Sequence, residues 1–211
     1  MFEYKYIAIE GNIGAGKTTL AKFLSNALNG ELLLEEFNEN KFLKEFYKSG
    51  QYAFHSEIQF LLDRSLQLKD FFNSKRELII SDYYPSKSLI FSKMNLSKRE
   101  YIQIKELSNM LFLDVPKPEI LFFIDRDIED IMDNIHKRGR AFEKNMNLQY
   151  IKKLSEGYEL WLKNINVPVI RIDAKSICLD NPLALEKSFK NLLKVNHIST
   201  QRRVKMDTMI N

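Results

Sequence analysis

A glycine-rich segment near the N-terminus restricts the fold of this chain more than any other feature. Residues 9–19 read IEGNIGAGKTT and fit the phosphate-loop pattern G-x-x-x-x-G-K-[ST] at every position. An apolar run precedes the segment and a helix-like run follows it, which is the strand–loop–helix context that the pattern requires. The backbone N–H groups of about residues 14–18 can form a concave site for a β-phosphate, aided by the dipole of the following helix.

The side chains of this loop indicate its ligand. We expect Lys17 to reach the β- and γ-phosphates of a nucleoside triphosphate, and the Thr18 hydroxyl to bind Mg²⁺. The residues expected to bind ATP here are Gly11, Asn12, Ile13, Gly14, Ala15, Gly16, Lys17, Thr18 and Thr19. The loop alone does not decide the fate of the γ-phosphate, because many phosphate-loop proteins are switches or motors and not small-molecule kinases.

Length and composition exclude several classes of protein. The chain has 211 residues, which favours one domain, and 32 Lys+Arg against 28 Asp+Glu leave a net charge of +4. This mixed balance does not indicate nucleic-acid binding, and no stretch approaches the roughly 20 apolar residues that span a membrane. The single cysteine, Cys178, excludes an internal disulfide and fits a reducing compartment. We expect a cytoplasmic protein with one domain over residues 1–198 and a loose or docked tail over residues 199–211.

Short apolar runs alternate with longer helical patterns along the chain. The predicted strands are residues 6–9, 31–34, 78–81, 120–124 and 167–172. The predicted helices are residues 17–28, 40–47, 54–72, 97–113, 128–137, 148–165 and 183–195. Such alternation predicts an α/β fold of three layers, in which a five-stranded parallel sheet lies between helices. Because ligands of such sheets bind outside the carboxyl ends of the strands, the residues directly after each strand are candidates for function.

Carboxylates follow the second and third predicted strands. Neighbouring residues of an extended chain point to opposite faces, so we expect only one of Glu35 and Glu36 to face the ligand. It would accept a proton from a hydroxyl near the γ-phosphate, and a solvated turn charge is an equal alternative. Asp82 ends the apolar run 78–81, a position that suits a residue holding Mg²⁺ directly or through water; a turn cap is the alternative.

Charged residues also occupy two less usual places. Arg138 and Arg140 flank a glycine after the helix 128–137, which suits a lid (about residues 138–147) that closes over phosphates. The alternative is a solvated basic stretch or a helix C-cap, which is what such a run usually is. Glu57 and Arg64 lie beside an apolar stripe of the helix 54–72 and should be partly buried. They form either a structural ion-pair network or a polar pair that reads a ligand.

The chain resembles the deoxyribonucleoside kinases, which phosphorylate the 5′-OH of deoxynucleosides with ATP. Four segments carry the resemblance: residues 10–19; residues 35–37 with 40–43 and 46–47; residues 53–64; and residues 138–143 with Tyr150 and residues 158–162. Their order and spacing match together, from the first strand to about residue 172. The resemblance implies a phosphate-loop kinase fold with a lid, ATP as the phosphate donor, and a homodimer formed through a helix bundle.

The resemblance implies roles at the phosphate end of the site. Glu35 matches the general base of the family at the end of the second strand, which decides between it and Glu36. Arg138 and Arg140 match lid arginines at the transferred phosphate. Asp173 begins a segment that resembles the loop covering the adenine of ATP.

The resemblance also implies a nucleoside site. Tyr47 and Glu143 match the pair that holds the deoxyribose 3′-OH. Arg64 matches an arginine near the 5′ end of the nucleoside, and Phe91 resembles the aromatic residue that packs on the base. The expected substrate-binding residues are Glu35, Tyr47, Phe54, Glu57, Arg64, Asp82, Phe91 and Glu143.

Glu57 stands where many members of this family have a base-reading Gln. An ionised carboxylate only accepts hydrogen bonds, whereas an amide both donates and accepts. A carboxylate therefore suits N1–H and N2–H₂ of guanine or N6–H₂ of adenine, and it opposes the carbonyls of a pyrimidine unless it is protonated. We expect a purine deoxynucleoside, deoxyadenosine or deoxyguanosine, as the substrate.

The chain departs from the family pattern at two places. The segment Asp82-Tyr83-Tyr84 stands where Asp/Glu-Arg-Ser is common, so the arginine that usually helps at the 5′-OH is missing and Lys87 is the candidate substitute. Asn134 stands where a third lid arginine often lies. These departures concern how the phosphates are held and leave the expected reaction class unchanged.

Two other functions stay open on the sequence. A thymidylate kinase shares the sheet and the loop, but it needs a further phosphate-binding arginine and typically has an Asp at the position of Ile13. A non-catalytic nucleotide switch needs no acceptor site. The set Glu35, Tyr47, Glu57, Arg64 and Glu143 argues against the switch.

Overall fold

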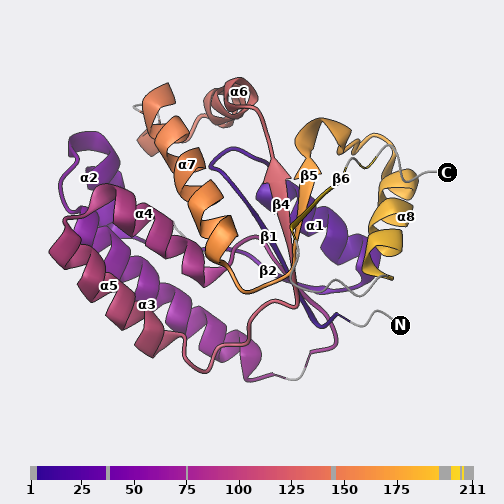
Figure 1. The fold of residues 1–211 in the computed structure, drawn as a ribbon, viewed down its shortest axis with the longest axis horizontal. Helices are drawn as coiled ribbons and strands as arrows, with labels where there is room; N and C mark the ends of the chain where they lie inside the picture. The colour runs from indigo at the N-terminus through magenta and orange to yellow at the C-terminus, as the bar shows by residue number, and fades with distance from the viewer. Residues whose placement is uncertain are drawn as a thin grey trace.

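A parallel six-stranded sheet forms the centre of the molecule in our computed structural model, which describes residues 4–36, 39–74, 76–143, 146–194, 201–204 and 206. The strand order is β2-β3-β1-β4-β5-β6 (Figure 1). The strands are β1 (Tyr6–Gly11), β2 (Glu31–Leu33), β3 (Ile79–Ser81), β4 (Ile120–Asp125), β5 (Val169–Asp173) and β6 (Gln201–Val204). All pairings are parallel, so the carboxyl ends of the strands meet at one edge.

Helices and short 3₁₀ turns connect the strands. The helices are α1 (Lys17–Leu28), α2 (Lys41–Ser49), α3 (Ala53–Phe72), α4 (Ser88–Asn95), α5 (Lys98–Leu111), α6 (Ile128–Arg138), α7 (Leu148–Asn164) and α8 (Pro182–Leu193). The 3₁₀ turns are η1 (Pro85–Lys87), η2 (Ala141–Glu143) and η3 (Ala174–Ser176). Within the described ranges, no helix is long and apolar enough to cross a membrane.

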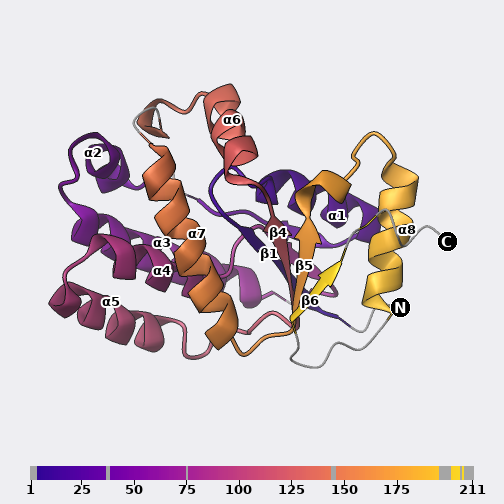
Figure 2. The same ribbon diagram turned by 45° about the horizontal axis from the view of Figure 1, so that its top comes forward.

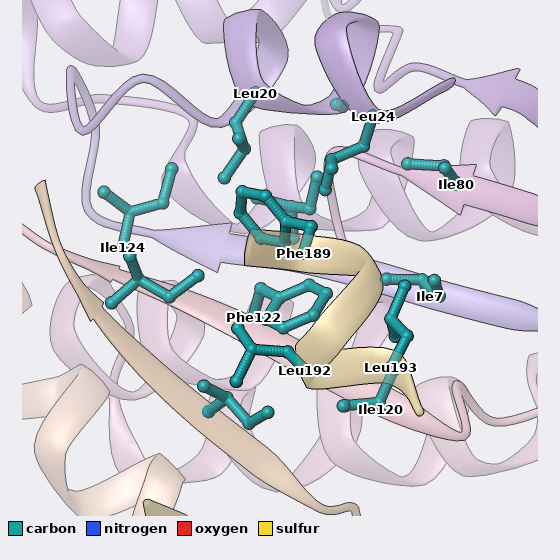
Figure 3. Close-up of a cluster of buried hydrophobic side chains, with 14 of the residues drawn as sticks. Ile7, Leu20, Leu24, Ile80, Ile120, Phe122, Ile124, Phe189, Leu192 and Leu193 are labelled. Atoms are coloured by element: carbon teal, nitrogen blue, oxygen red, sulfur yellow. The ribbon is translucent and has the colours of Figure 1, made fainter. Parts of the chain in front are cut away.

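The two faces of the sheet follow from the period of two along each strand. Ile7 and Ile9 of β1 lie in the core under α1 and α8, where the rings of Phe122 and Phe189 meet edge to face with centroids 5.1 Å apart (Figure 3). Ala8 points to the opposite face, where α3, α4 and α7 provide the cover. Figures 1 and 2 show α1 and α8 on one side of the sheet and α2 to α5 with α7 on the other. The expected three layers are therefore confirmed.

The five predicted strands are confirmed within two residues at each end, and the sheet continues with a sixth strand that we did not predict. This strand, β6, comes from the segment that we expected to be a loose or docked tail, and it pairs with β5. Its sequence Gln-Arg-Arg-Val carries a single apolar residue and so lacks the alternation by which strands are recognised. Parts of the predicted tail and of the predicted lid, residues 144–145 among them, lie outside the described residues.

Helix α4 is a further element that the sequence did not predict. Its buried side chains include Ser88 and Ser92, so its inner face is not the apolar stripe by which an amphipathic helix is found. The helix packs closely on α7, because a Cβ added at Gly157 would lie 2.6 Å from Cγ2 of Ile90. The predicted capping box of Ser97 and Glu100 at the start of α5 is confirmed.

Candidate active site

One cavity of about 680 Å³ lies at the carboxyl ends of the strands and brings most of the predicted site residues together. The loop after β1 closes one end of it, α2, α3 and α4 close the other, and the segment after α6 forms a wall. The predicted residues that line this cavity are Ile13, Gly14, Ala15, Gly16, Lys17, Thr18, Thr19, Glu35, Tyr47, Glu57, Arg64, Asp82, Phe91, Arg138, Arg140 and Glu143. Figure 2 shows α6 beyond the carboxyl end of β4.

Backbone geometry explains the glycines of the phosphate loop. Gly14 has φ +79° and Gly16 has φ +104°, values that residues with a Cβ rarely adopt. A Cβ at Gly14 would also lie 2.9 Å from the carbonyl oxygen of Ile131 in α6. Asn134 holds the loop from the same helix, because its Nδ2 donates a hydrogen bond of 2.9 Å to the Gly14 carbonyl. Asn134, expected from the sequence to stand where a third lid arginine often lies, therefore contacts the phosphate loop itself.

Lys17 is folded back on its own loop. Its Nζ donates hydrogen bonds of 2.8 Å to the carbonyl of Gly11 and 3.0 Å to that of Asn12. Burial lowers the pKa of Lys17 to about 8, with Lys87 as a further cause. A phosphate anion in the loop would relieve both effects by giving the ammonium group an opposite charge.

Asp82 joins the loop to the end of β2. Its Oδ2 accepts a hydrogen bond from the Thr18 hydroxyl, and its Oδ1 accepts one of 2.8 Å from the backbone N–H of Glu35. The hydroxyl and carboxylate oxygens of this pair are the hard ligands that Mg²⁺ prefers. No group of three or more His, Cys, Asp and Glu side chains gathers around a metal position in the described part of the chain, so ligands for Mg²⁺ beyond this pair would be phosphate and water.

Glu35 faces the cavity and is held by two cations. Its Oε1 pairs with Arg64 of α3 and its Oε2 accepts a hydrogen bond of 2.6 Å from Lys87, while Glu36 is exposed. Burial raises the pKa of the Glu35 carboxyl, but Lys87 and Arg64 outweigh it and hold this pKa at about 2. The carboxylate is therefore ionised and oriented before any substrate binds.

Glu10 forms a buried anchor behind this cluster that the sequence did not reveal as functional. Its Oε1 accepts a hydrogen bond of 2.7 Å from the backbone N–H of Tyr84 and lies 4.0 Å from Nζ of Lys87. The hydroxyl of Tyr158 donates to its other oxygen at 3.3 Å. Burial raises the pKa of Glu10, and Lys87 and Lys17 oppose the rise. Its place within β1 gave no signal, because the strand-end rule points only to residues after a strand.

The far end of the cavity has aromatic walls and one buried carboxyl group. Glu57 is 7% exposed, and its Oε2 accepts a hydrogen bond of 3.1 Å from the Ser92 hydroxyl. Burial raises the pKa of Glu57 to about 7, against the opposing effect of Arg64. Phe91 and Phe60 line the same end. An apolar slot with one polar group at its end can bind a flat base and read one edge of it.

Glu143 gathers the arginines of the wall. Arg138 contacts both of its carboxylate oxygens, at 2.7 Å and 2.6 Å, and Arg140 approaches at 3.4 Å. The side chain of Tyr47 is nearby, with its ring stacked on Phe142 at a centroid distance of 5.9 Å. The predicted 3′-OH pair and the predicted lid arginines therefore belong to one cluster.

Four predicted site residues do not line the cavity: Gly11 and Asn12 at the start of the phosphate loop, Phe54 and Asp173. Phe54 is the second residue of α3 and lies three residues before Glu57. At 100° per residue it is about 60° round the helix from Glu57, on the side away from Ser56, which lines the cavity. Asp173 instead caps turn η3 through a hydrogen bond of 3.0 Å from the Lys175 backbone N–H. The cavity side of that loop is formed by Ile177 and Leu179, which were not predicted.

Arg126 is another cavity residue outside the predicted site residues. It follows β4, and its Nε donates a hydrogen bond of 3.0 Å to the carbonyl of Ala15 in the phosphate loop. The strand-end rule had indicated the range 125–127 without choosing a residue in it. An alternating set of charges after β4 could not show which one turns toward the loop.

Comparison with known proteins decides the family. The deoxynucleoside kinase family profile matches residues 7–198, nearly the whole chain. The chain belongs to the deoxynucleoside kinase family. It is therefore a phosphate-loop kinase that uses ATP, as the resemblance of the four segments predicted.

Individual deoxynucleoside kinases match over most of their length. Deoxyguanosine kinase of Bacillus subtilis is 34% identical over 180 residues, which cover 81% of this chain and 87% of that protein. Deoxyadenosine/deoxycytidine kinase of the same organism is 29% identical over 196 residues, 89% of each chain. The solved structure of M. mycoides deoxyadenosine kinase with bound dCTP superposes with a TM-score of 0.76 at 26% identity, covering 90% of this chain and 99% of that one.

Proposed function

We propose that this kinase transfers the γ-phosphate of ATP to the 5′-OH of a purine deoxyribonucleoside, deoxyadenosine or deoxyguanosine, in nucleotide salvage. The observation that carries the proposal is the position of Glu57, a buried carboxyl group at the end of the cavity opposite the phosphate loop, which in its ionised form accepts hydrogen bonds from a purine. Glu35 lines the same cavity between these two ends. Its carboxylate can therefore reach a hydroxyl group of a substrate that lies between the base and the phosphate. Relatives named for deoxyguanosine and deoxyadenosine support the purine assignment.

The residues divide the reaction between them. Lys17 and the loop N–H groups hold the β- and γ-phosphates, and Glu35 accepts a hydrogen bond from the 5′-OH. The 5′ oxygen forms a bond to the γ-phosphorus, the bond to the β–γ bridging oxygen breaks, and ADP leaves. The proton of the 5′-OH passes to the Glu35 carboxylate, because the 5′ oxygen becomes more acidic as its bond to phosphorus forms. Arg138 and Arg140 can offset the charge on the transferred group.

The proposal includes Mg²⁺ at the Thr18–Asp82 pair. These oxygen ligands fit the ion, and Mg²⁺ would neutralise charge on the β- and γ-phosphates. The contact between Asp82 and Thr18 supports the predicted role of Asp82 in the metal site. The other carboxylate oxygen of Asp82 accepts a hydrogen bond from the backbone N–H of Glu35 and so helps to position that residue.

Substitution of the proposed base tests the proposal against a non-catalytic nucleotide switch. We expect Glu35→Gln to lose at least about a hundredfold in kcat while ATP binding persists, because general-base effects are of that order. Glu36→Gln is the matched control, since Glu36 is the exposed neighbour. Unchanged transfer in Glu35→Gln would remove Glu35 from the base role.

A thymidylate kinase is less consistent with this site. Arg64 and Lys87 line the cavity beside the proposed base, and both are already paired with Glu35. A nucleoside monophosphate would bring its phosphate against that carboxylate. ATP turnover measured with deoxyadenosine, deoxyguanosine and dTMP separates the two, and preference for dTMP would overturn the purine nucleoside assignment.

We further propose that the enzyme is a homodimer that acts in the cytoplasm. Large apolar side chains are exposed on the adjacent helices α3 and α5, with Leu66 63% and Met110 75% exposed (Figure 1). A single cysteine fits a reducing compartment. Light scattering after gel filtration tests the dimer: Leu66→Glu should shift the mass toward the monomer, whereas a monomeric wild type would refute it.

A further inference from the structure

The C-terminal strand reaches the loop on the ATP side of the cavity. β6 extends the sheet beyond β5, with Val169 opposite Gln201 and Ile172 opposite Val204. Val204 and Met206 are 6% and 2% exposed, and both belong to the core formed with α1 and α8. This segment is therefore packed into the domain and is not a free extension.

The hydroxyl group of Ser176 joins this segment to the loop. Ser176 lies in turn η3 and is 4% exposed. Its Oγ accepts a hydrogen bond of 3.0 Å from the backbone N–H of Met206 and donates one of 2.6 Å to the carbonyl of Asp173. A single buried oxygen thus links the end of β5 with Met206, the second residue after β6.

The loop held in this way provides one side of the cavity. Ile177 and Leu179 follow η3 and line the cavity, and Ile177 also packs against the core that contains Met206. Lys175 in η3 pairs with Asp127, the neighbour of Arg126. The apolar side chains of Ile177 and Leu179 and the guanidinium of Arg126 therefore line the same part of the cavity, a combination that suits the flat base of ATP. The phosphate loop is adjacent, because Arg126 also contacts it.

We propose that β6 and Met206 act as a brace that positions Ile177 and Leu179 for the adenine of ATP, with the Ser176 hydroxyl as the joint. The inference rests on the use of ATP by this site and assigns a binding function to a segment outside the cavity. The brace affects the base of ATP, whereas Lys17 and the loop N–H groups bind the phosphates independently of it.

Binding measurements on Ser176→Ala test the brace. The substitution removes both hydrogen bonds and leaves the backbone unchanged, so the loop loses its link to Met206. Loss of one or two buried hydrogen bonds corresponds to about a three- to tenfold increase in the Kd for ATP, measured by calorimetry. The Kd for inorganic tripolyphosphate, which engages only the phosphate loop, should not change.

Ser188→Ala is the matched control. Ser188 is also buried in this layer, but its hydroxyl donates to Ala184 within its own helix α8. Its Kd for ATP should equal that of the wild type. A chain that ends after Thr200 is the second variant and should show the same selective loss for ATP, with a larger magnitude than Ser176→Ala.

The outcomes separate clearly. Equal weakening of ATP and tripolyphosphate, or an unchanged Kd for ATP in a Ser176→Ala protein that melts cooperatively, would overturn the brace. Unfolding of the shortened chain leaves Ser176→Ala to decide. Because binding is measured without a nucleoside, failure of the proposed purine substrate would appear only in turnover and would not affect this result.

Discussion

Lys87 donates a hydrogen bond of 2.6 Å to Glu35, although the lysine lies in turn η1 after β3 and the glutamate follows β2. The sequence made Lys87 the candidate substitute for the missing arginine near the 5′-OH, and that role stays a prediction. Arg64 pairs with the other oxygen of the same carboxylate. The orientation and the ionisation of Glu35 thus depend on two cations from different elements.

Removing one of these cations should move the acid limb of the rate profile. In Lys87→Met, the pKa of Glu35 should rise from its value of about 2, because Lys87 is the largest influence that lowers it. We expect kcat/KM at neutral pH to fall about tenfold or more, and its acid limb to shift to higher pH. Profiles between pH 4 and 8 check this, because the Glu35 limb of the wild type lies below this range and that of the variant should enter it; the exposed Lys93→Met is the control. A variant profile without an acid limb in this range would contradict the electrostatic role of Lys87.

The base preference should change with the amide at position 57. Above pH 7, where the Glu57 carboxyl is ionised, Glu57→Gln replaces an acceptor by a group that also donates, which suits the acceptor edge of a pyrimidine. We expect kcat/KM for deoxyguanosine to fall about tenfold or more and that for deoxycytidine to rise. A panel of eight nucleosides at fixed ATP measures both changes, and Glu106→Gln on the exposed face of α5 is the control. A panel that keeps its order in Glu57→Gln would assign base reading elsewhere.

Glu57 should also make stability depend on pH. Its pKa is raised from 4.5 to about 7 in the folded protein, so the folded state favours the neutral carboxyl. Its contribution to the free energy of unfolding is therefore greatest below pH 4.5 and decreases as pH rises toward about 7. Urea unfolding at pH 5 and pH 7.5 should show a larger decrease for the wild type than for Glu57→Gln. Parallel behaviour of the two proteins would mean that Glu57 does not titrate in this range.

The role of Glu143 can be tested on the substrate as well as on the enzyme. If Glu143 binds the 3′-OH, the wild type should discriminate against a 2′,3′-dideoxynucleoside, and Glu143→Ala should lose most of that discrimination. The ratio of kcat/KM for the two nucleosides, measured on both proteins, isolates this contact from the effect of Glu143 on Arg138. A ratio that survives the substitution would place the 3′-OH against another group.

Gly157 sets the distance between α7 and α4. Alanine normally favours a helix over glycine, but a Cβ here would lie 2.6 Å from Ile90, so we expect Gly157→Ala to lower the free energy of unfolding by about 1–3 kcal/mol. Urea denaturation measures the change. The double variant Gly157→Ala with Ile90→Ala should lose less free energy of unfolding than the sum of the losses of the two single variants. A loss equal to that sum would refute the steric cause.

The phosphate loop could be predicted from the sequence more fully than the rest of the cavity. The phosphate loop encodes its structure locally, since Gly14 and Gly16 adopt positive φ angles that residues with a Cβ rarely adopt. Glu35, Glu57 and Arg64 were identified as residues, but their mutual contacts depend on how α3 and α4 pack, and α4 itself was not predicted.

Missing parts of the site share a physical reason. Glu10 lies within a buried strand, Arg126 in a run of mixed charges, and Ser176 in a short turn. None of these positions differs locally from a structural residue, and each gains its role from a partner distant in sequence. The strand β6 was missed in the same way, because its edge pairing depends on β5 and not on its own pattern.

Helix α3 carries Glu57 and Arg64 almost two turns apart, on the side that faces the cavity. Any displacement of this helix to fit a different base would also displace the cation that holds Glu35. New selectivity gained by remodelling α3 should therefore reduce the rate of transfer. Variants of α2 residues such as Phe46, which line the cavity without a hydrogen bond to Glu35, offer engineering and evolution a route to other nucleosides at a smaller cost in turnover.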